Sequence, residues 1–267
     1  MTDLAALLEP VLAIAHEAGA AIMDIYQSNF AVELKEDRSP LTAADRAAHQ
    51  IIVAGLSRLP AGVPVLSEES ADTDFANRRA WNRFWLVDPL DGTKEFIKRN
   101  GEFTVNIALI DDHRPVLGVV VAPAIDISFF GAVGIGAFRE SRGQRDPIAV
   151  SRPAREPLRV VGSRSHASPD LEAFLDRLGP HELRSMGSSL KICLVAAGDA
   201  DLYPRLGPTS EWDTAAAEAV LRAAGGSMMD LEGQPLTYNA RESLLNPYFL
   251  ALGDIKIRER LAHSRTG

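Results

Sequence analysis

Apolar residues recur every three or four positions through residues 3–27, which is the spacing of one buried helix face. Thr2 or Asp3 stands where the N-cap of such a helix is expected. The segment carries no pattern of site chemistry, so we predict a long helix that packs on the core.

A short strand candidate at residues 31–35 leads into a charged, turn-like stretch at residues 35–40. We predict a surface loop there, with a charge that fits a flap over the metal site described below. A second helix is predicted from Thr42, as its N-cap, to about residue 59, with Asp45 at the third helical position.

Two short apolar runs then end in acids. Residues 62–70 end in Glu68 and Glu69, which are adjacent, and on an extended chain only one of the two can readily enter a shared site. The run at residues 84–87 predicts a buried strand that stops at Asp88.

Strand patterns dominate the middle of the chain, and mixed patterns follow. Closely spaced apolar runs with glycine-rich turns predict an antiparallel meander with strands at residues 103–109, 116–122, 127–132 and 136–139. From about residue 157 strands and helices alternate, which is typical of α/β organisation, with strands at residues 158–162, 183–186, 201–205, 226–229 and 248–252 and helices at residues 168–178, 187–197, 211–226 and 254–263.

The proline- and arginine-rich stretch at residues 146–157 separates these two patterns. We therefore predict an α+β subdomain with an antiparallel sheet at residues 1–150 and an α/β subdomain at residues 151–267. A chain of 267 residues that is 46% hydrophobic can bury a large core as one domain or as two packed halves.

The composition limits the kinds of molecule that the chain is expected to bind and the compartment in which it is expected to work. The net charge of −8, without a basic block, argues against nucleic-acid binding, so an anionic substrate would need metal ions or a local positive pocket. The single cysteine, Cys193, fits a reducing, cytoplasmic compartment and a buried apolar role. No apolar run reaches membrane-spanning length, so no integral membrane segment is expected. Peripheral contact with the inner face of the cell membrane stays open, as does the choice between monomer and homodimer.

The strongest candidate chemistry lies in the stretch W-L-V-D-P-L-D-G-T-K. A proline stiffens the turn and Gly92 allows a sharp bend, so Asp88 and Asp91 can converge at the carboxyl end of the strand. The free amides of Gly92, Thr93 and Lys94 can point at an anion. Carboxylates for a hard cation beside amides for a phosphate indicate a metal-dependent phosphoryl site, and the alternative is a helix N-cap with a spare turn acid.

Three further acids each have an ordinary structural explanation. Asp45 could cap its helix, Glu68 could open a solvated loop, and Asp213, in the first turn of its helix, could complement the helix dipole. Together with Asp88 and Asp91 they form a set at the ends of elements. Two-metal phosphoryl chemistry needs such a set, with one carboxylate bridging the ions.

Four motifs, in order, resemble the lithium-sensitive inositol monophosphatase superfamily over nearly the whole chain: T-A-A-D ending at Asp45, S-E-E beginning at Ser67, W-L-V-D-P-L-D-G-T ending at Thr93, and W-D-x-A-A beginning at Trp212. Within it, the continuation G-T-K-E-F-I-K-R-N-G-E-F-T-V-N-I-A-L-I is similar to bacterial 3′(2′),5′-bisphosphate nucleotidases of the CysQ type, because inositol monophosphatases usually carry T-N-F after D-G-T. The resemblance implies a layered αβαβα sugar-phosphatase fold.

The resemblance also implies two to three Mg²⁺ ions as cofactors. The first would be held by Glu68, Asp88 and the Leu90 carbonyl, and Asp88 would bridge to a second ion that is also held by Asp91 and Asp213. A third, weaker ion near Glu68 would bring the attacking water.

The catalytic residues implied are Asp45, Thr93 and Glu68. Asp45 and Thr93 would orient the water and help to deprotonate it, and the Gly92 and Thr93 amides would hold the phosphate. Glu68, Leu90, Asp91, Gly92, Thr93 and Asp213 would thus also contact the substrate.

Family nucleotidases bind the nucleoside and its other phosphate with the C-terminal part of the chain, and the matching positions here are His166, Ser188, Lys191 and Arg205. Lys191 and Arg205 would meet the spared 5′-phosphate. His166 could instead cap the following helix, and Lys191 could be a solvated helix residue. The stretch G-P-T-S-E before Trp212 departs from the family pattern and could shape the substrate entrance.

The function expected is removal of the 3′-phosphate of adenosine 3′,5′-bisphosphate, a small phosphate ester, to give AMP, with a role in sulfate assimilation and inhibition by lithium. Alternative substrates are 3′-phosphoadenylyl sulfate, inositol monophosphate and fructose 1,6-bisphosphate. A non-catalytic nucleotide sensor is the alternative from another class, but a sensor has no need of Asp45 and Thr93.

Overall fold

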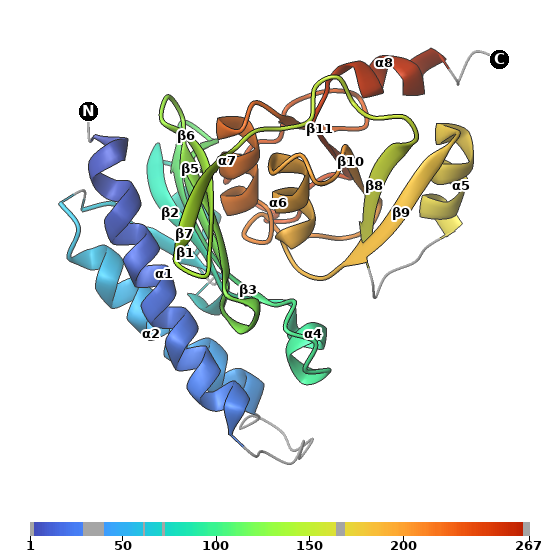
Figure 1. Cartoon of the computed structure of the whole chain (residues 1–267). Coiled ribbons are helices and arrows are strands. Elements are labelled where there is room, and N and C mark those ends of the chain that lie inside the picture. The colour runs from blue at the N-terminus through green and yellow to red at the C-terminus, as the bar shows by residue number, and fades with distance from the viewer. Residues whose placement is uncertain (1–2, 29–39, 61, 71–72, 164–168, 264–267) are drawn as a thin grey trace.

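Helices and sheets alternate in five layers in the computed structural model of the chain (Figure 1). The structure describes residues 3–28, 40–60, 62–70, 73–163 and 169–263. Within these ranges the helices are α1 (Leu4–Gln27), α2 (Pro40–Ser57), α3 (Phe75–Arg78), α4 (Thr93–Ile97), α5 (Pro169–Leu178), α6 (Leu190–Ala196), α7 (Ala215–Ala223) and α8 (Lys256–His263), with short 3₁₀ helices η1 (Glu68–Ser70) and η2 (Pro123–Ile125).

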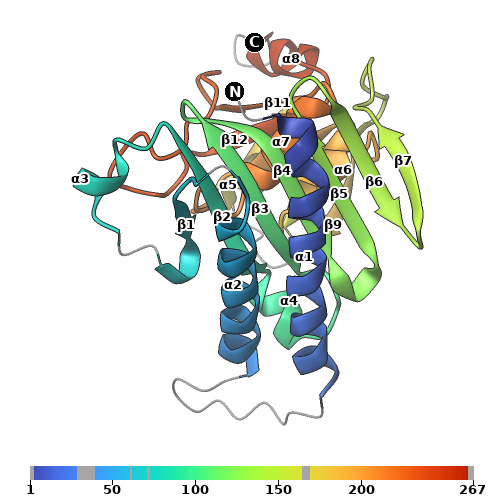
Figure 2. The same ribbon diagram turned by 90° about the vertical axis from the view of Figure 1, so that its left-hand side faces the viewer.

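The first sheet has seven strands in the order of the chain: β1 (Val65–Ser67), β2 (Arg83–Asp91), β3 (Thr104–Asp111), β4 (Arg114–Ala122), β5 (Ile127–Ala132), β6 (Gly136–Ser141) and β7 (Gln144–Ile148). Only β1 and β2 run parallel; β2 to β7 form the predicted antiparallel meander. The sequence pattern missed β7 because its residues are largely polar and half-exposed or exposed. Helices α1 and α2 cover the outer face of this sheet (Figure 2).

The second sheet has five strands in the order β11-β12-β10-β8-β9, with β8 (Leu158–Ser163), β9 (His181–Met186), β10 (Leu202–Arg205), β11 (Ser227–Asp230) and β12 (Phe249–Leu252). Strand β8 runs parallel to β9 and β10, while β12 is antiparallel to β10 and β11. Helices α6 and α7 lie between the two sheets, and α5 and α8 lie outside the second one (Figure 1). This is the αβαβα layering that was predicted.

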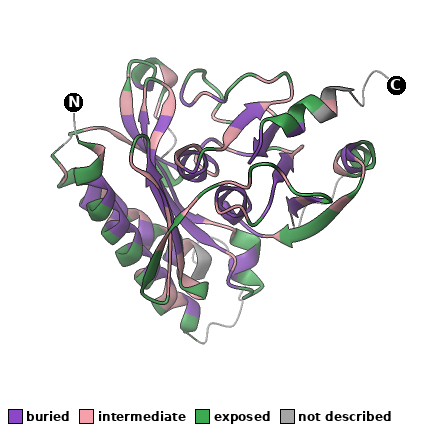
Figure 3. Ribbon diagram, turned by 45° about the horizontal axis from the view of Figure 1, so that its top comes forward, coloured by how far each residue is buried: buried purple, intermediate pink, exposed green. Residues whose placement is uncertain are grey.

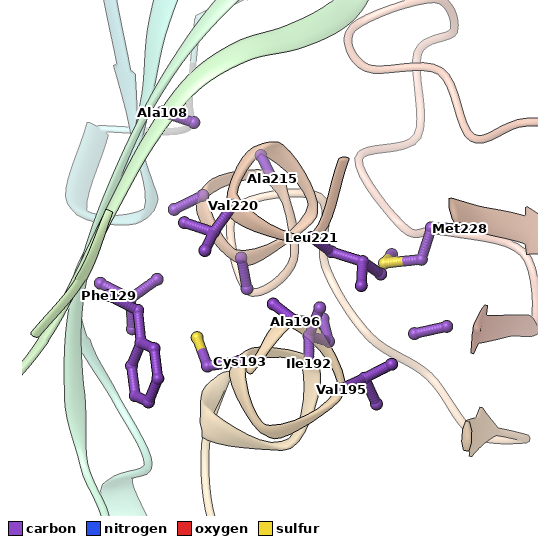
Figure 4. Close-up of a cluster of buried hydrophobic side chains, with 14 of the residues drawn as sticks. Ala108, Phe129, Ile192, Cys193, Val195, Ala196, Ala215, Val220, Leu221 and Met228 are labelled. Atoms are coloured by element: carbon purple, nitrogen blue, oxygen red, sulfur yellow. The ribbon is translucent and has the colours of Figure 1, made fainter. Parts of the chain in front are cut away.

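The largest apolar cluster fills the space around α6 and α7 (Figure 4). It joins both sheets, since Phe84 of β2 and Phe249 of β12 belong to it. Gly118 of β4 lets α7 lie directly on the sheet, because a Cβ at this position would stand 2.1 Å from the Ala216 carbonyl oxygen of α7. The alanines of α7 keep its side of the contact small. Because one core spans the sheets, the division into subdomains at residue 150 stays a prediction.

Helix α1 is long and apolar enough, by length and composition, to cross a membrane, so the expectation that no segment reaches that length is wrong. Half of its most apolar window is buried inside the protein. Figure 3 shows the buried residues on one side of the helix, and Asp3 caps its N-terminus by accepting from the Ala5 N–H at 3.0 Å. These are the contacts of a core helix.

Several predicted boundaries are also wrong. Helix α2 begins at Pro40, whose ring presets the backbone for a first helical position, so Thr42 is not the N-cap and Asp45 lies beyond the third position. Helix α7 begins at Ala215, which leaves Asp213 in the preceding turn. The strand predicted at residues 31–35 and the loop that follows it lie outside the described residues.

Candidate active site

Three carboxylates meet at one end of the first sheet. One oxygen each of Asp88, Asp91 and Asp213 lies within 4.8 Å of the others. Residues three apart on a regular strand point to opposite faces, but the pairing of β2 with β3 shifts between Asp88 and Asp91. The strand therefore continues through Asp88, where the sequence predicted it to stop, and this irregularity lets both acids serve one site.

Glu68 reaches the same place from the neighbouring strand. Because β1 runs parallel to β2, with Ser67 opposite Val87, Glu68 follows the strand end directly beside Asp88. Its carboxyl group feels the charge of Asp91, and its own charge acts on Asp88. The structure thus brings Glu68 together with the Asp88 group, as predicted from the sequence.

The two glutamates at the end of β1 act on different acids, and Glu68 alone of the two is among those whose charge raises the pKa of Asp88. Residues 68–70 form a 3₁₀ helix, where consecutive side chains are about 120° apart and not on opposite faces. The charge of Glu69 acts on Asp45, and Glu68 and Asp88 each influence the pKa of the other. The expectation that only one of the two glutamates joins Asp88 and Asp91 therefore still fits the structure, although the backbone there is a 3₁₀ turn and not an extended strand.

Burial and mutual repulsion raise the pKa values of five acids: Asp45, Glu68, Asp88, Asp91 and Asp213. Burial, then the charge of Glu69, raise the pKa of Asp45 to about 8. Burial, then the charge of Asp213, raise the pKa of Asp91 to about 7, and burial raises the pKa of Asp213 itself to about 6. The pKa values of Glu68 and Asp88 are raised for the same reasons. Cations that offset this repulsion would stabilise the ionised acids.

The acid group suits a hard divalent cation. Its donors are all oxygens, and a buried Asp45 Oδ1 has no hydrogen-bond partner among the described residues. The Leu90 N–H donates to Asp88 Oδ1 at 3.0 Å, which orients that carboxylate. The Leu90 carbonyl as a further ligand remains a prediction.

Gly92 makes the turn from β2 into α4. Its φ of +96° is in the left-handed region, and a Cβ there would stand 3.2 Å from the Glu102 carbonyl oxygen, so a side chain would be strained and crowded. The predicted helical turn does start at Thr93, whose side chain is exposed at the cavity. Phosphate binding by these amides stays a prediction.

A cavity of about 240 Å³ opens beside the acids. Its walls come from both sheets, and the predicted site residues that line it are Asp91, Gly92, Thr93, Ser188, Lys191, Arg205 and Asp213. Of the other predicted substrate contacts, Glu68 and Leu90 do not line this cavity, and His166 lies outside the described residues. The structure therefore places the predicted C-terminal contacts next to the predicted metal ligands.

Two of the cationic residues that line the cavity, Lys191 and Arg205, are held by local contacts. Lys191 is 7% exposed, so it is not the solvated helix residue that the sequence left open, and burial lowers its pKa to about 8. It donates to the Ser188 carbonyl and lies 5.5 Å from the Tyr203 ring centre. Arg205 donates to Thr209 Oγ1 and to the Pro208 carbonyl, which ties the unusual G-P-T-S-E stretch to the cavity wall.

Ser189 joins the two walls and was not predicted. Its N–H donates to Asp91 Oδ2 at 2.6 Å, and its hydroxyl donates to Asn106 Oδ1 at 2.6 Å. The hydroxyl also lies 2.9 Å from Thr104 Oγ1, and all of these side chains but Asp91 are buried. The partners are some 80 to 100 positions away in the chain, so no local pattern could have revealed the link.

Comparison with known proteins shows which family has this arrangement of helices, sheets and acids. The model of the inositol monophosphatase family matches residues 3–264. The chain belongs to the inositol monophosphatase family. This confirms the resemblance found in the four motifs, and it accounts for the αβαβα layers.

Within the inositol monophosphatase family, the chain is similar to proteins named 3′(2′),5′-bisphosphate nucleotidase CysQ. That of Escherichia coli K12 is 55% identical over 245 residues, covering 91% of this chain and 98% of that protein. That of Buchnera aphidicola is 44% identical over 250 residues, covering 92% and 93%.

Solved structures agree. CysQ from Bacteroides thetaiotaomicron superimposes with a TM-score of 0.85 at 44% identity, covering 92% of this chain and 96% of that one. An inositol monophosphatase from Zymomonas mobilis gives a TM-score of 0.79 at 25% identity, covering 99% and 100%. Enzymes of the inositol monophosphatase family use divalent metal ions, typically Mg²⁺, and the acid group described above fits such ions.

Proposed function

We propose that the protein is a Mg²⁺-dependent phosphatase that removes the 3′-phosphate of adenosine 3′,5′-bisphosphate to give AMP and phosphate. The observation that carries this proposal is the cavity with acids on one wall and Lys191 and Arg205 on the other. A substrate with two phosphates suits it, because one phosphate can meet cations at the acids while the other meets the basic side chains. The naming of the CysQ relatives supports the same substrate.

The acids at the end of the first sheet, together with Asp213 from the turn before α7, are the proposed metal ligands. Two to three ions would be held by Glu68, Asp88, the Leu90 carbonyl, Asp91 and Asp213, with Asp88 between them. When bound, Mg²⁺ supplies positive charge that offsets the phosphate and lowers the pKa of a bound water. Asp88 suits the bridging position because it is 1% exposed and feels the charges of all the other acids in the group except Glu69.

Asp45 and Thr93 are the proposed groups that act on the attacking water. Asp45, which bound cations would keep ionised, accepts the water proton, and its buried Oδ1 has no other hydrogen-bond partner among the described residues. The water oxygen bonds to phosphorus as the bond from phosphorus to the 3′-oxygen breaks in line, and the 3′-oxygen takes up a proton from solvent water as AMP leaves. The Gly92 and Thr93 amides hold the phosphate during this step.

Lys191 and Arg205 are the proposed contacts of the spared 5′-phosphate, with Ser188 beside them in the cavity. A cytoplasmic location also stays a prediction, whereas the structure offers no support for attachment to the membrane surface. Whether the enzyme works as a monomer or as a homodimer is likewise left to measurement.

A substrate panel tests the proposal. Phosphate release by the purified protein in Mg²⁺ should be at least about a hundredfold more efficient with adenosine 3′,5′-bisphosphate than with inositol 1-phosphate, a difference of about 2.7 kcal/mol. A hundredfold preference for the inositol ester would assign the protein to the other substrate class. Nucleotide binding without turnover would instead make it a sensor.

A further inference from the structure

A distant segment of the chain closes over the turn that carries Asp213. The Asn246 N–H donates to the Thr209 carbonyl at 2.8 Å, and the Glu211 N–H donates to the Leu244 carbonyl at 2.8 Å. Between these bonds, Ser210 pairs with Leu245 as an isolated antiparallel bridge. The loop at residues 244–246 is thus attached to the backbone just before Asp213.

The Asn246 side chain then holds the turn on both sides of Asp213. Its Nδ2 donates to the Ser210 carbonyl at 2.9 Å and to Thr214 Oγ1 at 2.9 Å. Ser210 in turn donates its N–H to Asp213 Oδ2 at 2.9 Å. One amide group therefore bridges the ends of the five-residue turn whose carboxylate enters the acid group.

The contacts of Asn246 are not those of a residue selected for packing alone. The side chain is 8% exposed, and its Oδ1 has no hydrogen-bond partner among the described residues. A buried acceptor without a partner is unfavourable to stability, so an apolar side chain of similar size would serve a purely structural role as well. What the amide provides is the pair of donated hydrogen bonds.

The far end of the turn is anchored further. Thr214 Oγ1 donates to the Glu211 carbonyl at 3.1 Å and lies 3.2 Å from the Tyr238 hydroxyl. That hydroxyl donates to Glu218 of α7, and all four residues are buried. The turn is therefore held between Asn246 and the body of the protein, which limits the positions that the Asp213 carboxylate can take.

We propose that Asn246 is a positioning residue that holds Asp213 in the geometry required for binding a divalent cation. The inference rests on the proposed role of Asp213 as a metal ligand. Partners of metal ligands orient the ligand atoms, and their loss typically weakens metal binding by about 10- to 100-fold. Nothing in the motifs of the sequence marks Asn246, since it acts through Ser210 and Thr214.

The test is direct binding of Mn²⁺ to the metal-free protein, measured by calorimetry and by the paramagnetic resonance of the free ion. Asn246→Leu should bind Mn²⁺ about 10- to 100-fold more weakly than the wild type. Ser243→Ala is the matched control: it removes the bond from the Leu245 N–H to Ser243 Oγ, in the same loop but away from Asp213, and should bind as the wild type does. Wild-type Mn²⁺ affinity in a folded Asn246→Leu protein overturns the inference.

If Asn246→Leu fails to fold, Thr214→Val provides a second test of the inference. It removes one acceptor of the Asn246 amide and should weaken Mn²⁺ binding in the same direction, so unchanged affinity in that variant also overturns the inference. The readout needs no substrate. Tight Mn²⁺ binding without phosphatase activity would contradict the proposed function alone, whereas a wild-type protein that binds no Mn²⁺ would contradict the inference itself.

Discussion

The two walls of the cavity are built in different ways. The acids of the first wall follow directly on hydrogen-bonded strands: Glu68 on β1, and Asp88 and Asp91 on β2. The cations of the second wall depend on a short helix and a loop, with Lys191 on α6 and Arg205 held by the residues that follow β10. The walls differ in degree: most of the acids that would bind metal lie at strand ends, although Asp213 lies on a turn, and the cations that would select the substrate are held by a helix and a loop, although Arg205 itself ends β10.

The largest expected effect concerns the acid wall. Asp88→Asn removes the carboxylate that lies among the other acids, so turnover should fall by about a thousandfold or more, as a loss of several kcal/mol implies. Phosphate release at saturating Mg²⁺ and substrate measures it. Asp146→Asn, on the exposed strand β7, is the control and should keep wild-type turnover. Wild-type turnover in the Asp88 variant would contradict the assignment of Asp88 as a metal ligand.

The basic wall should respond differently. Lys191→Met removes a buried cation from the cavity and should raise KM for adenosine 3′,5′-bisphosphate by about 10- to 100-fold, the size of a hydrogen bond to a charged group. The KM for 3′-AMP, which lacks the second phosphate, should change little. Initial rates with both substrates measure the contrast. Equal losses with both would show that Lys191 does not distinguish the spared phosphate.

The sequence predicts those site residues that belong to a local pattern or to a motif. Asp88 and Asp91 were predicted because a buried strand with acids at its end is a local pattern, and the motifs added Asp45, Glu68 and Asp213. The backbone at Glu68 and Glu69 was predicted wrongly, because a 3₁₀ turn replaces the extended strand assumed there.

Residues whose role depends on distant partners could not be predicted. Ser189 acts through Asp91 and Asn106, and Asn246 acts through the turn at residues 210–214, so neither has a neighbour in sequence that reveals it. The fold was predicted better than the site because periodic apolar patterns define elements, but helix starts shifted at Pro40 and Ala215.

Glu218 offers a buried acid between the walls and outside the metal group. Burial raises its pKa from 4.5 to about 7, and the Tyr238 hydroxyl donates to it. The folded protein therefore keeps this proton to a higher pH than the unfolded chain. The resulting contribution to stability, about 3 kcal/mol, is full below pH 4.5 and is lost as the pH rises to 7.

Glu218→Gln cannot titrate, so its unfolding free energy should fall less than that of the wild type between pH 4.5 and 7. Urea unfolding of both proteins in chelator, across this range, measures the difference. The raised pKa values of the site acids contribute equally to both curves. Parallel curves would mean that Glu218 is ionised in the folded protein throughout.

The smallest expected effect lies at the joint between the walls. Ser189→Ala leaves the bond from its N–H to Asp91 but removes the hydroxyl from Asn106 and Thr104, which should lower the unfolding free energy by about 1–3 kcal/mol. Urea unfolding measures this loss. Ser243→Ala, on the surface loop, is the control and should change stability by no more than about 0.5 kcal/mol. If the two variants are equally stable, the buried link between the walls contributes nothing.

One ratio tests the central claim that an acidic wall performs the chemistry while a basic wall selects a substrate with two phosphates. It is kcat/KM for adenosine 3′,5′-bisphosphate divided by kcat/KM for 3′-AMP, measured on the wild-type protein in Mg²⁺. Two cations at the spared phosphate predict a ratio of about 100 or more. A ratio near one would contradict the account, because the cavity would then hydrolyse the ester without recognising the second phosphate.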